Sequence, residues 1–269
     1  MEREECYFGI NDEILRDSLD SLSVFKEDRP LVVGGLAIQI HGKERERILR
    51  KTSDADLLSE NESFENFCEG TYKKIYSSLK EKGYQVYSKR GRGNNAVKVV
   101  KNMNKPGQET FLLHWTLFPG EQYENFSDYI QRQKQFAEEV SYSGERESVL
   151  VASLEEILPL KIRRTFTHGN KREDLVGPLY ESLVSNAKRG NWGTLASLPL
   201  TDLGRGLIRL QKRLKEKGPY TKERFFTYKL SKDVYDLCLS ARLIADSSID
   251  FDKYRYEENL VRILGENSS

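Results

Sequence analysis

The sequence has little of what marks several large classes of protein. Among 269 residues there are three cysteines, seven prolines and two tryptophans. Cys6, Cys68 and Cys238 lie far apart and form no Cys-x-x-Cys pair, so we expect reduced thiols, as in a cytoplasmic protein. No stretch approaches the roughly eighteen apolar residues of a membrane span, and the acidic start MEREECYFGI does not resemble a secretory signal. We therefore expect no membrane partner.

An excess of one charge is missing as well. Lys and Arg number 43 and Asp and Glu 42, which gives a net charge of +1. Binding of nucleic acid by overall charge is therefore not expected, and any such contact would need a local basic cluster. A composition of 38% hydrophobic and 32% charged residues is typical of a globular protein with a charged surface. Its length allows one large domain or two small ones.

Hydrophobic periodicity divides the chain into a mixed first half and a helical second half. The apolar residues at 12–28 recur at helical spacing, and Pro30 ends this helix before a short apolar strand at 31–33. A short helix follows to Gly42, and residues 53–58 alternate like a half-buried strand. The later patterns predict a helix at 63–82, strands at 84–89, 96–101 and 110–118, and a hairpin over 139–152. We expect an α+β fold with a small mixed sheet flanked by helices over 1–120 and a mostly helical domain over 121–269.

Two short motifs carry the chemistry of this sequence. The strand Val32-Val33 ends in Gly34-Gly35, and glycines at the start of a helix let backbone N–H groups approach a phosphate. Asp54 and Asp56 then share one face of a strand, where hard carboxylate oxygens can hold Mg²⁺ or Mn²⁺. Either motif alone also occurs in ordinary turns and solvated strands. Their ordered combination predicts a site for a nucleoside triphosphate with its metal ion.

The runs LVVGGLAIQIHG and RKTSDADLL resemble the opening motif of the DNA polymerase β-like nucleotidyltransferase superfamily, and within it the abortive-infection toxin (AbiEii type) branch. The matching positions are Gly34, Gly35, Gly42, Arg50, Ser53, Asp54 and Asp56. Residues 153–179 are similar to a later motif of that branch, with Lys161, Arg164, Arg172 and Asp174 as its candidates. The resemblance implies that Lys161 reaches the triphosphate and that Asp174 orients it. An amphipathic helix with surface ion pairs is the other interpretation of these four residues.

The sequence departs from that family at one catalytic position. Active members carry a third carboxylate on a later strand, and here no Asp or Glu lies between Glu109 and Glu121. His114 occupies the corresponding place, and an imidazole has a suitable pKa for a general base. Three interpretations stay open: His114 is the base, Glu109 takes the place through a different register, or the enzyme is inactive.

The leading hypothesis is a metal-dependent nucleotidyltransferase that moves a nucleoside monophosphate from a nucleoside triphosphate onto an RNA, for which tRNA is one candidate, or onto a protein hydroxyl. The resemblance implies a toxin that a partner antitoxin protein neutralises. A nucleotide- or protein-binding module without turnover is the alternative, and a nuclease is weaker because no His-x-His, His-Asp or Glu-x-Lys cluster is present. The basic clusters at 43–51, 89–93 and 205–217 are candidates for phosphate contacts or are simply solvated surfaces.

Overall fold

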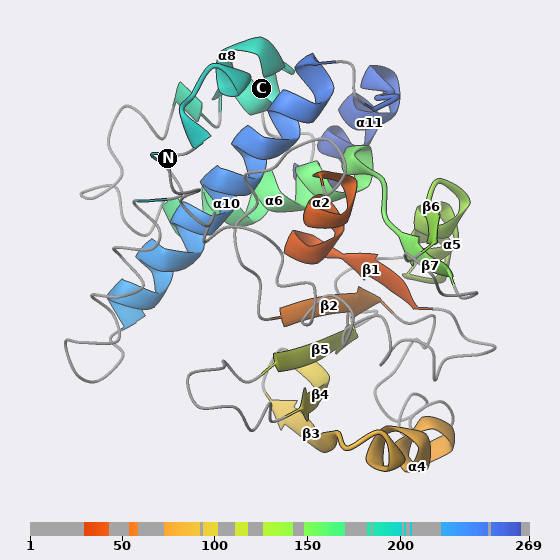
Figure 1. Cartoon of the computed structure of the whole chain (residues 1–269). Helices are drawn as coiled ribbons and strands as arrows, with labels where there is room; N and C mark the ends of the chain where they lie inside the picture. Colours follow the sequence, from red (N-terminus) through yellow and green to blue (C-terminus); the bar gives the residue numbers. More distant parts are fainter. Residues whose placement is uncertain are drawn as a thin grey trace, which may run out of the picture. The chain divides into compact units, whose positions relative to one another are not determined.

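The described part of the chain contains one mixed β-sheet, with helices between its strands and after the last of them (Figure 1). This computed structural model describes residues 30–42, 54–58, 73–91, 94–101, 111–117, 126–141, 148–169, 182–183, 185–200, 202, 205, 222–246 and 249–264. The strands are β1 (Leu31–Val33), β2 (Asp54–Leu58), β3 (Gln85–Gly91), β4 (Asn94–Lys101), β5 (Phe111–Leu117), β6 (Glu138–Ser141) and β7 (Ser148–Val151). The helices are α2 (Gly34–Gly42), α4 (Lys73–Glu81), α5 (Phe126–Gln135), α6 (Leu154–Gly169), α8 (Trp192–Ala196), α10 (Lys222–Ala245) and α11 (Lys253–Leu264).

The strands are ordered β3-β4-β5-β2-β1-β7-β6 across the sheet. The pairs β1–β7 and β2–β5 are parallel, and the other pairs are antiparallel. Both parallel pairs join strands that are far apart in the chain, as parallel pairing requires because a crossover connection must fit between them. The mixed sheet and the α+β class predicted from the sequence are confirmed.

The register shows which residues of β2, β5, β4 and β3 share a face of the sheet. Register partners lie on the same face, and successive residues alternate between faces. One face carries Ala55 and Leu57 of β2 and, in register with them, Leu113 and Trp115 of β5. Val97 and Val99 of β4 continue this apolar face. The opposite face carries Asp54, Asp56 and His114 together with the apolar residues Leu58, Leu112 and Val100.

Strand β1 and helix α2 form a continuous buried segment. Leu31 and Val32 are fully buried in the strand, and Leu36, Ala37 and Ile38 are buried in the helix. A helix that is apolar on most sides belongs inside a protein rather than on its surface. The Gly34-Gly35 pair, where β1 ends and α2 begins, therefore lies between two buried stretches of chain.

The helical part of the chain is built on the long helix α10, which packs against α6 and α8, whereas α11 packs against α6. Tyr235, Leu237 and Leu239 of α10 are buried. Trp192 lies edge-on to both Phe251 and Tyr256, with ring centroids 5.6 and 5.2 Å apart. Burial raises the pKa of the Tyr256 hydroxyl, and that hydroxyl donates a hydrogen bond to a backbone carbonyl at 2.6 Å.

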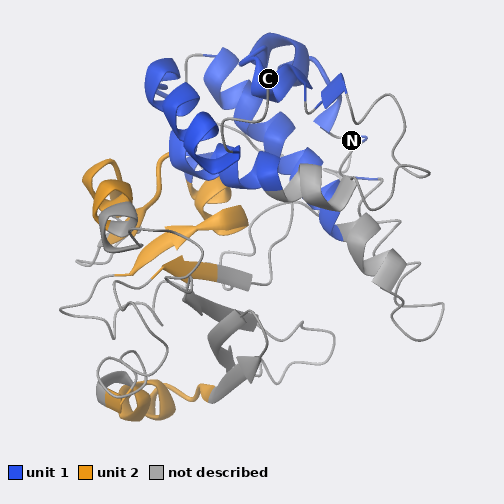
Figure 2. Cartoon of the chain, turned by 180° about the vertical axis from the view of Figure 1, so that it is seen from behind, with its two compact units in different colours: residues 1–9, 41–50, 154–269 blue, residues 10–40, 51–153 orange. Residues whose placement is uncertain are grey.

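The chain divides into two compact units, shown in different colours in Figure 2. One unit consists of residues 10–40 and 51–153 and holds the sheet, and the other consists of 1–9, 41–50 and 154–269 and holds α6 to α11. This boundary differs from the one expected at residue 120. The reason is that the hairpin β6–β7 joins the sheet, where Leu150 pairs with Leu31 and the N–H of Ala152 donates to the carbonyl of Val32 at 2.9 Å.

The predicted elements agree with the observed ones apart from their ends. The hairpin at 139–152 appears as β6 and β7, and the predicted helix at 63–82 contains α4 at 73–81. Strands β3 and β4 extend further into the predicted turn at 90–95 than expected, because Arg90 pairs with Asn95 and Gly91 with Asn94. The predicted helix at 12–28 lies outside the described residues.

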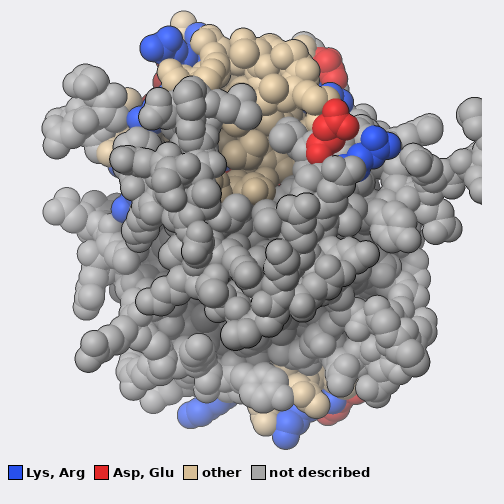
Figure 3. Space-filling view, turned by 90° about the vertical axis from the view of Figure 1, so that its left-hand side faces the viewer, with Lys and Arg blue, Asp and Glu red and all other residues tan. Residues whose placement is uncertain are grey.

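The described surface is mixed in charge. In the view of Figure 3, the coloured Lys and Arg side chains stand apart from one another or next to Asp and Glu. Of the predicted basic clusters, residues 43–51 lie outside the described part, and the cluster at 205–217 is described only at Arg205, which lies 3.9 Å from Asp202. Within the described residues, no helix combines the length and the apolar character that crossing a membrane would need.

Candidate functional site

Gly34 is held where any side chain would collide with the carboxylate of Asp56. Its φ is +70°, a conformation that residues with a side chain rarely adopt. A Cβ atom built on Gly34 would lie 2.6 Å from Oδ2 of Asp56. The cause is the antiparallel pairing of β1 and β2, which puts Val33 opposite Asp56. Val33, the last residue of β1, and Gly34, the first residue of α2, therefore both lie next to Asp56.

The two aspartates occupy the expected places on β2. Asp54 and Asp56 are separated by one residue in an extended strand, so both positions lie on the same face. Asp56 is half-buried, whereas Leu57 and Leu58, which follow it in the strand, are buried. A carboxylate near the first turn of a helix is favoured by the positive end of the helix dipole. The glycine turn and the Asp-x-Asp strand, which the sequence separates by about twenty residues, are adjacent in the fold.

His114 lies on the strand next to the two aspartates. Strands β2 and β5 are parallel, and their register puts Asp56 opposite His114 and Asp54 opposite Leu112. Strand β5 contains no Asp or Glu. Glu109, the other candidate for the third carboxylate, lies outside the described residues. The register therefore gives His114 the position next to Asp56, while its role as a base stays a prediction.

Lys161 lies in the helical unit, buried between two carboxylates. Its ammonium is 3.0 Å from Oδ1 of Asp233 and 2.5 Å from Oδ2 of Asp236, and the three side chains are 4%, 0% and 0% exposed. Asp233 and Asp236 are three residues apart on α10, so they share one face of that helix. The second interpretation of the motif, a surface helix with ion pairs, is wrong for Lys161, because this ion pair is buried.

Asp233 and Asp236 were not singled out from the sequence, although a signal for them exists. The two acids lie three residues apart within a run of buried hydrophobic residues that includes Leu230, Tyr235 and Leu237. Buried carboxylates need a cation or hydrogen-bond donors. Such a pattern predicts a basic partner on another helix, but it does not tell which one.

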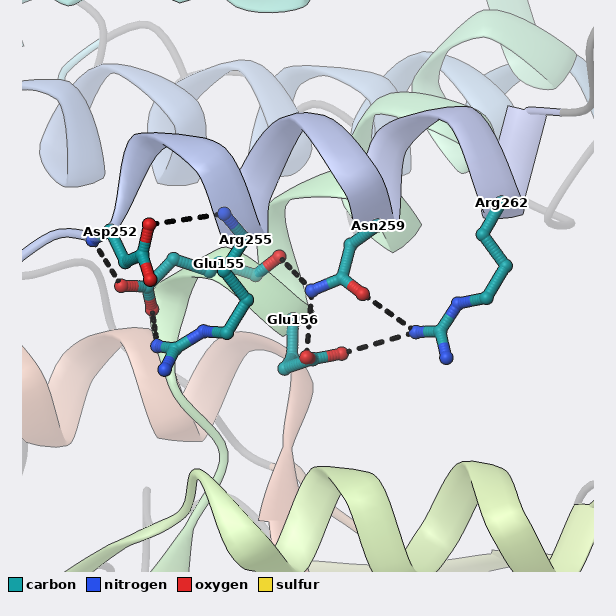
Figure 4. Close-up of polar contacts among 6 residues, drawn as sticks. All are labelled: Glu155, Glu156, Asp252, Arg255, Asn259 and Arg262. Atoms are coloured by element: carbon teal, nitrogen blue, oxygen red, sulfur yellow. Dashed lines mark hydrogen bonds and ion pairs between the residues drawn. The ribbon is translucent and has the colours of Figure 1, made fainter.

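The helix that carries Lys161 is fixed at its first turn by α11 (Figure 4). Glu155 accepts a hydrogen bond from the N–H of Asp252 at 2.7 Å and pairs with Arg255 at 2.7 Å. Glu156 accepts one from the side-chain amide of Asn259 at 2.6 Å and pairs with Arg262 at 3.4 Å.

The two glutamates are nearly or fully buried, so each carboxylate exchanges water for these fixed donors. The same Asn259 amide also reaches the backbone carbonyl of Glu155 at 3.2 Å. This network explains how charged residues fit into the core of the helical unit.

Several predicted site residues cannot be placed. Arg50, Ser53, Arg172 and Asp174 lie outside the described residues, and Arg164 is described only as part of the backbone of α6. Gly35 and Gly42 are the second and last residues of α2. Among residues whose structure is described, no group of three or more His, Cys, Asp or Glu side chains is arranged to hold a metal ion.

Comparison with known proteins gives little further information. No model of a protein family matches the chain, and no curated protein matches it in sequence. One similar solved structure is that of an antigenic nucleotidyltransferase-like protein from Paracoccidioides brasiliensis. The similarity covers 60% of this chain and 70% of that protein's chain, with 19% sequence identity and a TM-score of 0.37.

Proposed function

We propose that the protein is a metal-dependent nucleotidyltransferase, which transfers a nucleoside monophosphate from a nucleoside triphosphate to an RNA, such as tRNA, or to a protein hydroxyl. The observation that carries this proposal is the contact between Gly34 and Asp56. It joins a glycine turn at a helix start, suited to phosphate, to a carboxylate pair, suited to a divalent cation.

The donor set fits Mg²⁺ or Mn²⁺. Asp54 and Asp56 offer hard oxygen ligands. Gly34 lets the Asp56 carboxylate approach the start of α2, because a Cβ there would lie 2.6 Å from its Oδ2. When bound there, the ion would neutralise negative charge on the phosphates. The backbone N–H groups at Gly34 and Gly35 would orient the triphosphate, and Ser53 and Arg50 stay candidates for further phosphate contacts.

The reaction would be an in-line displacement. An acceptor hydroxyl oxygen bonds to the α-phosphorus, the bond from that phosphorus to the bridging oxygen breaks, and pyrophosphate leaves. The hydroxyl proton needs an acceptor, and the register position of His114 next to Asp56 makes its imidazole the candidate base. Lys161 and Asp174 stay candidates for triphosphate contacts on the sequence resemblance alone, and the Lys161 ammonium pairs with Asp233 and Asp236.

A second candidate function is a binding module that takes nucleotide without turnover. It is favoured by one observation, the lack of an acidic residue in β5. A toxin role with an antitoxin protein as partner, and a place in the cytoplasm, are parts of the proposal that rest on the sequence resemblance and composition.

The proposal is tested by incubating the protein with each α-³²P-labelled nucleoside triphosphate, Mg²⁺ or Mn²⁺ and total RNA. Label should appear in RNA or protein, with release of pyrophosphate, and the Asp54→Ala/Asp56→Ala variant should lose transfer. Asp202→Ala/Asp246→Ala removes the same charge at two exposed aspartates and should transfer normally. Nucleotide binding without transfer would favour the binding module, and release of a nucleoside monophosphate from RNA would favour a nuclease.

His114 is tested by two substitutions with opposite expectations. His114→Ala should lower the rate and remove the pH dependence that the imidazole causes. His114→Asp installs a carboxylate at the position next to Asp56 and should retain transfer with a base of lower pKa, so the rate should stay high at more acidic pH. Equal activity of His114→Ala and the wild type at every pH would exclude the imidazole as the base.

A further inference from the structure

Helix α2 carries a fully buried glutamine. Gln39 is 0% exposed, and its Nε2 and Oε1 atoms are both buried with no hydrogen-bond partner among the described residues. Its neighbours in the helix, Leu36, Ala37 and Ile38, are apolar and buried. A buried polar group without a partner has lost its bonds to water and gained none in return, and such groups are rare in native proteins. Gln39 therefore marks a place where the described part of the chain supplies no partner for an amide.

The helical period puts Gln39 on the same side of α2 as Gly35. The two residues are four positions apart, and residues at this spacing lie one above the other on a helix. Side chains of a helix lean toward its N-terminus, so the Gln39 amide extends toward the first turn, on the side where Gly35 has no side chain. Gly34 and Gly35 are partly exposed, whereas residues 36–39 are buried. The amide is therefore directed at the turn of α2 that solvent reaches.

The same turn is the end of α2 that attracts an anion. The first backbone N–H groups of a helix have no partner within it, and the helix dipole adds a partial positive charge there. The Nε2 atom of Gln39 is a further donor directed at this end. Because this donor is already removed from water, a hydrogen bond to an anion costs it no further desolvation. A phosphate group offers the several acceptor oxygens that the turn and the amide require.

We propose that the Gln39 amide binds the phosphates of the nucleoside triphosphate, with Nε2 donating a hydrogen bond to a phosphate oxygen on the first turn of α2. The inference rests on the proposed nucleotidyltransferase function and adds a binding residue to those that the sequence motifs single out. The contact needs a small shift of the first turn, because Nε2 is covered in the structure. Gly34, with a φ of +70°, and Gly35 give this turn the backbone freedom to move. Oε1, an acceptor, would take a hydrogen bond from a water molecule that accompanies the phosphates.

The variant Gln39→Met removes the amide and keeps the length of the side chain. It also removes the cost of a buried amide without a partner, so it should unfold at a temperature about 2–10 °C above that of the wild type. Gln133→Met is the matched control, because Gln133 is a glutamine that is 1% exposed in α5 of the same compact unit. This control should bind triphosphate like the wild type.

The experiment measures dissociation constants by isothermal titration calorimetry in the presence of Mg²⁺. The ligands are the nucleoside triphosphates and inorganic tripolyphosphate, which has the phosphates but neither ribose nor base. Loss of a hydrogen bond to a charged group typically weakens binding about 10- to 100-fold. We expect this loss in Gln39→Met for the best-bound nucleotide and for tripolyphosphate alike. A glutamine with a purely structural role would not give weaker binding in a variant that is more stable than the wild type.

Four results would overturn the phosphate contact of Gln39. The first is no binding of tripolyphosphate by the wild type, and the second is equal affinity of Gln39→Met and the wild type. The third is a loss for nucleotides but not for tripolyphosphate, which would assign the amide to the ribose or the base. The fourth is an equal loss in Gln39→Met and Gln133→Met, which would point to a general disturbance of the unit.

The same measurements keep this inference apart from the proposed function. If Gln39→Met binds nucleotide as tightly as the wild type and the wild type transfers label, only the contact of Gln39 fails. If Gln39→Met loses nucleotide and tripolyphosphate as expected but the wild type transfers no label, the phosphate contact stands and the nucleotidyltransferase function fails.

Discussion

Replacement of Lys161 by methionine should strongly destabilise the helical unit. The lysine ammonium lies 3.0 and 2.5 Å from two carboxylates, and all three side chains are at most 4% exposed. Removal of one partner from a buried ion pair typically costs about 3–5 kcal/mol, because the remaining charge stays buried. Here two negative charges would be left facing each other on α10. For a chain of this size such a loss lowers the melting temperature by roughly 6–20 °C.

The assay is urea unfolding at neutral pH, followed by circular dichroism and by tryptophan fluorescence. Lys253→Met is the matched control, because Lys253 is 64% exposed and lies 3.6 Å from Glu257. Exposed ion pairs contribute less than about 1 kcal/mol, so this variant should unfold almost like the wild type. The variant Lys161→Met/Asp233→Asn/Asp236→Asn removes these three charges together and should recover most of the lost stability.

A loss below about 1 kcal/mol in Lys161→Met, or no recovery in the variant without charges, would refute the electrostatic reasoning. The same variants separate stability from activity. If Lys161 acts on the triphosphate as proposed, the recovered variant should be folded and still inactive in transfer. If the lysine is only structural, activity should return together with stability.

Three further predictions concern other parts of the molecule. Gly34→Ala should lower transfer about 100-fold, because a shift of about 1 Å in the Asp56 carboxylate has an effect of that size. The control is Gly83→Ala, since Gly83 also has a positive φ (+82°) but no neighbour within 4 Å of its Cβ position. This control should cost only about 1–2 kcal/mol of backbone strain in thermal unfolding and leave transfer unchanged. Asn259→Ala removes a donor from the buried Glu156 carboxylate and should cost about 1–3 kcal/mol in urea unfolding; an unchanged midpoint would contradict the importance of that bond. Burial raises the pKa of Cys238 from 9.0 to about 12, against the opposing influence of a nearby arginine. Between about pH 9 and 12 the folded thiol keeps a proton that the unfolded one loses, so stability should fall with rising pH in this window, and Cys238→Ala should fall less steeply; equal slopes would exclude this explanation.

Local patterns were sufficient for much of the sheet unit. Pro30 and the glycine pair predicted the short strand β1, because proline ends a helix and glycine ends a strand by simple steric rules. Alternation in residues 53–58 predicted β2, and the turn residues at 90–95 predicted the connection between β3 and β4. The ends of β3 and β4 were missed because cross-strand pairing carried both strands into a stretch whose composition is typical of a turn.

The helical unit shows where local patterns fail. No local pattern in residues 153–179 indicated that the Lys161 ammonium lies between two acids about seventy residues further along the chain. A charged residue on a helix carries no information about which distant helix will pack against it. The boundary between the units was missed for a similar reason, since β7 joins β1 across more than a hundred residues.

The sequence by itself determined the local chemistry of the sheet unit: a glycine turn after a buried strand, and two aspartates on one face of another. These follow from steric limits and from the two-residue period of a strand, which need no knowledge of distant contacts. Only the tertiary structure decided that the Asp56 carboxylate lies against Gly34 and that His114 stands in register with it. Those contacts depend on the order of strands in the sheet, which is set by packing of the whole unit rather than by any local pattern.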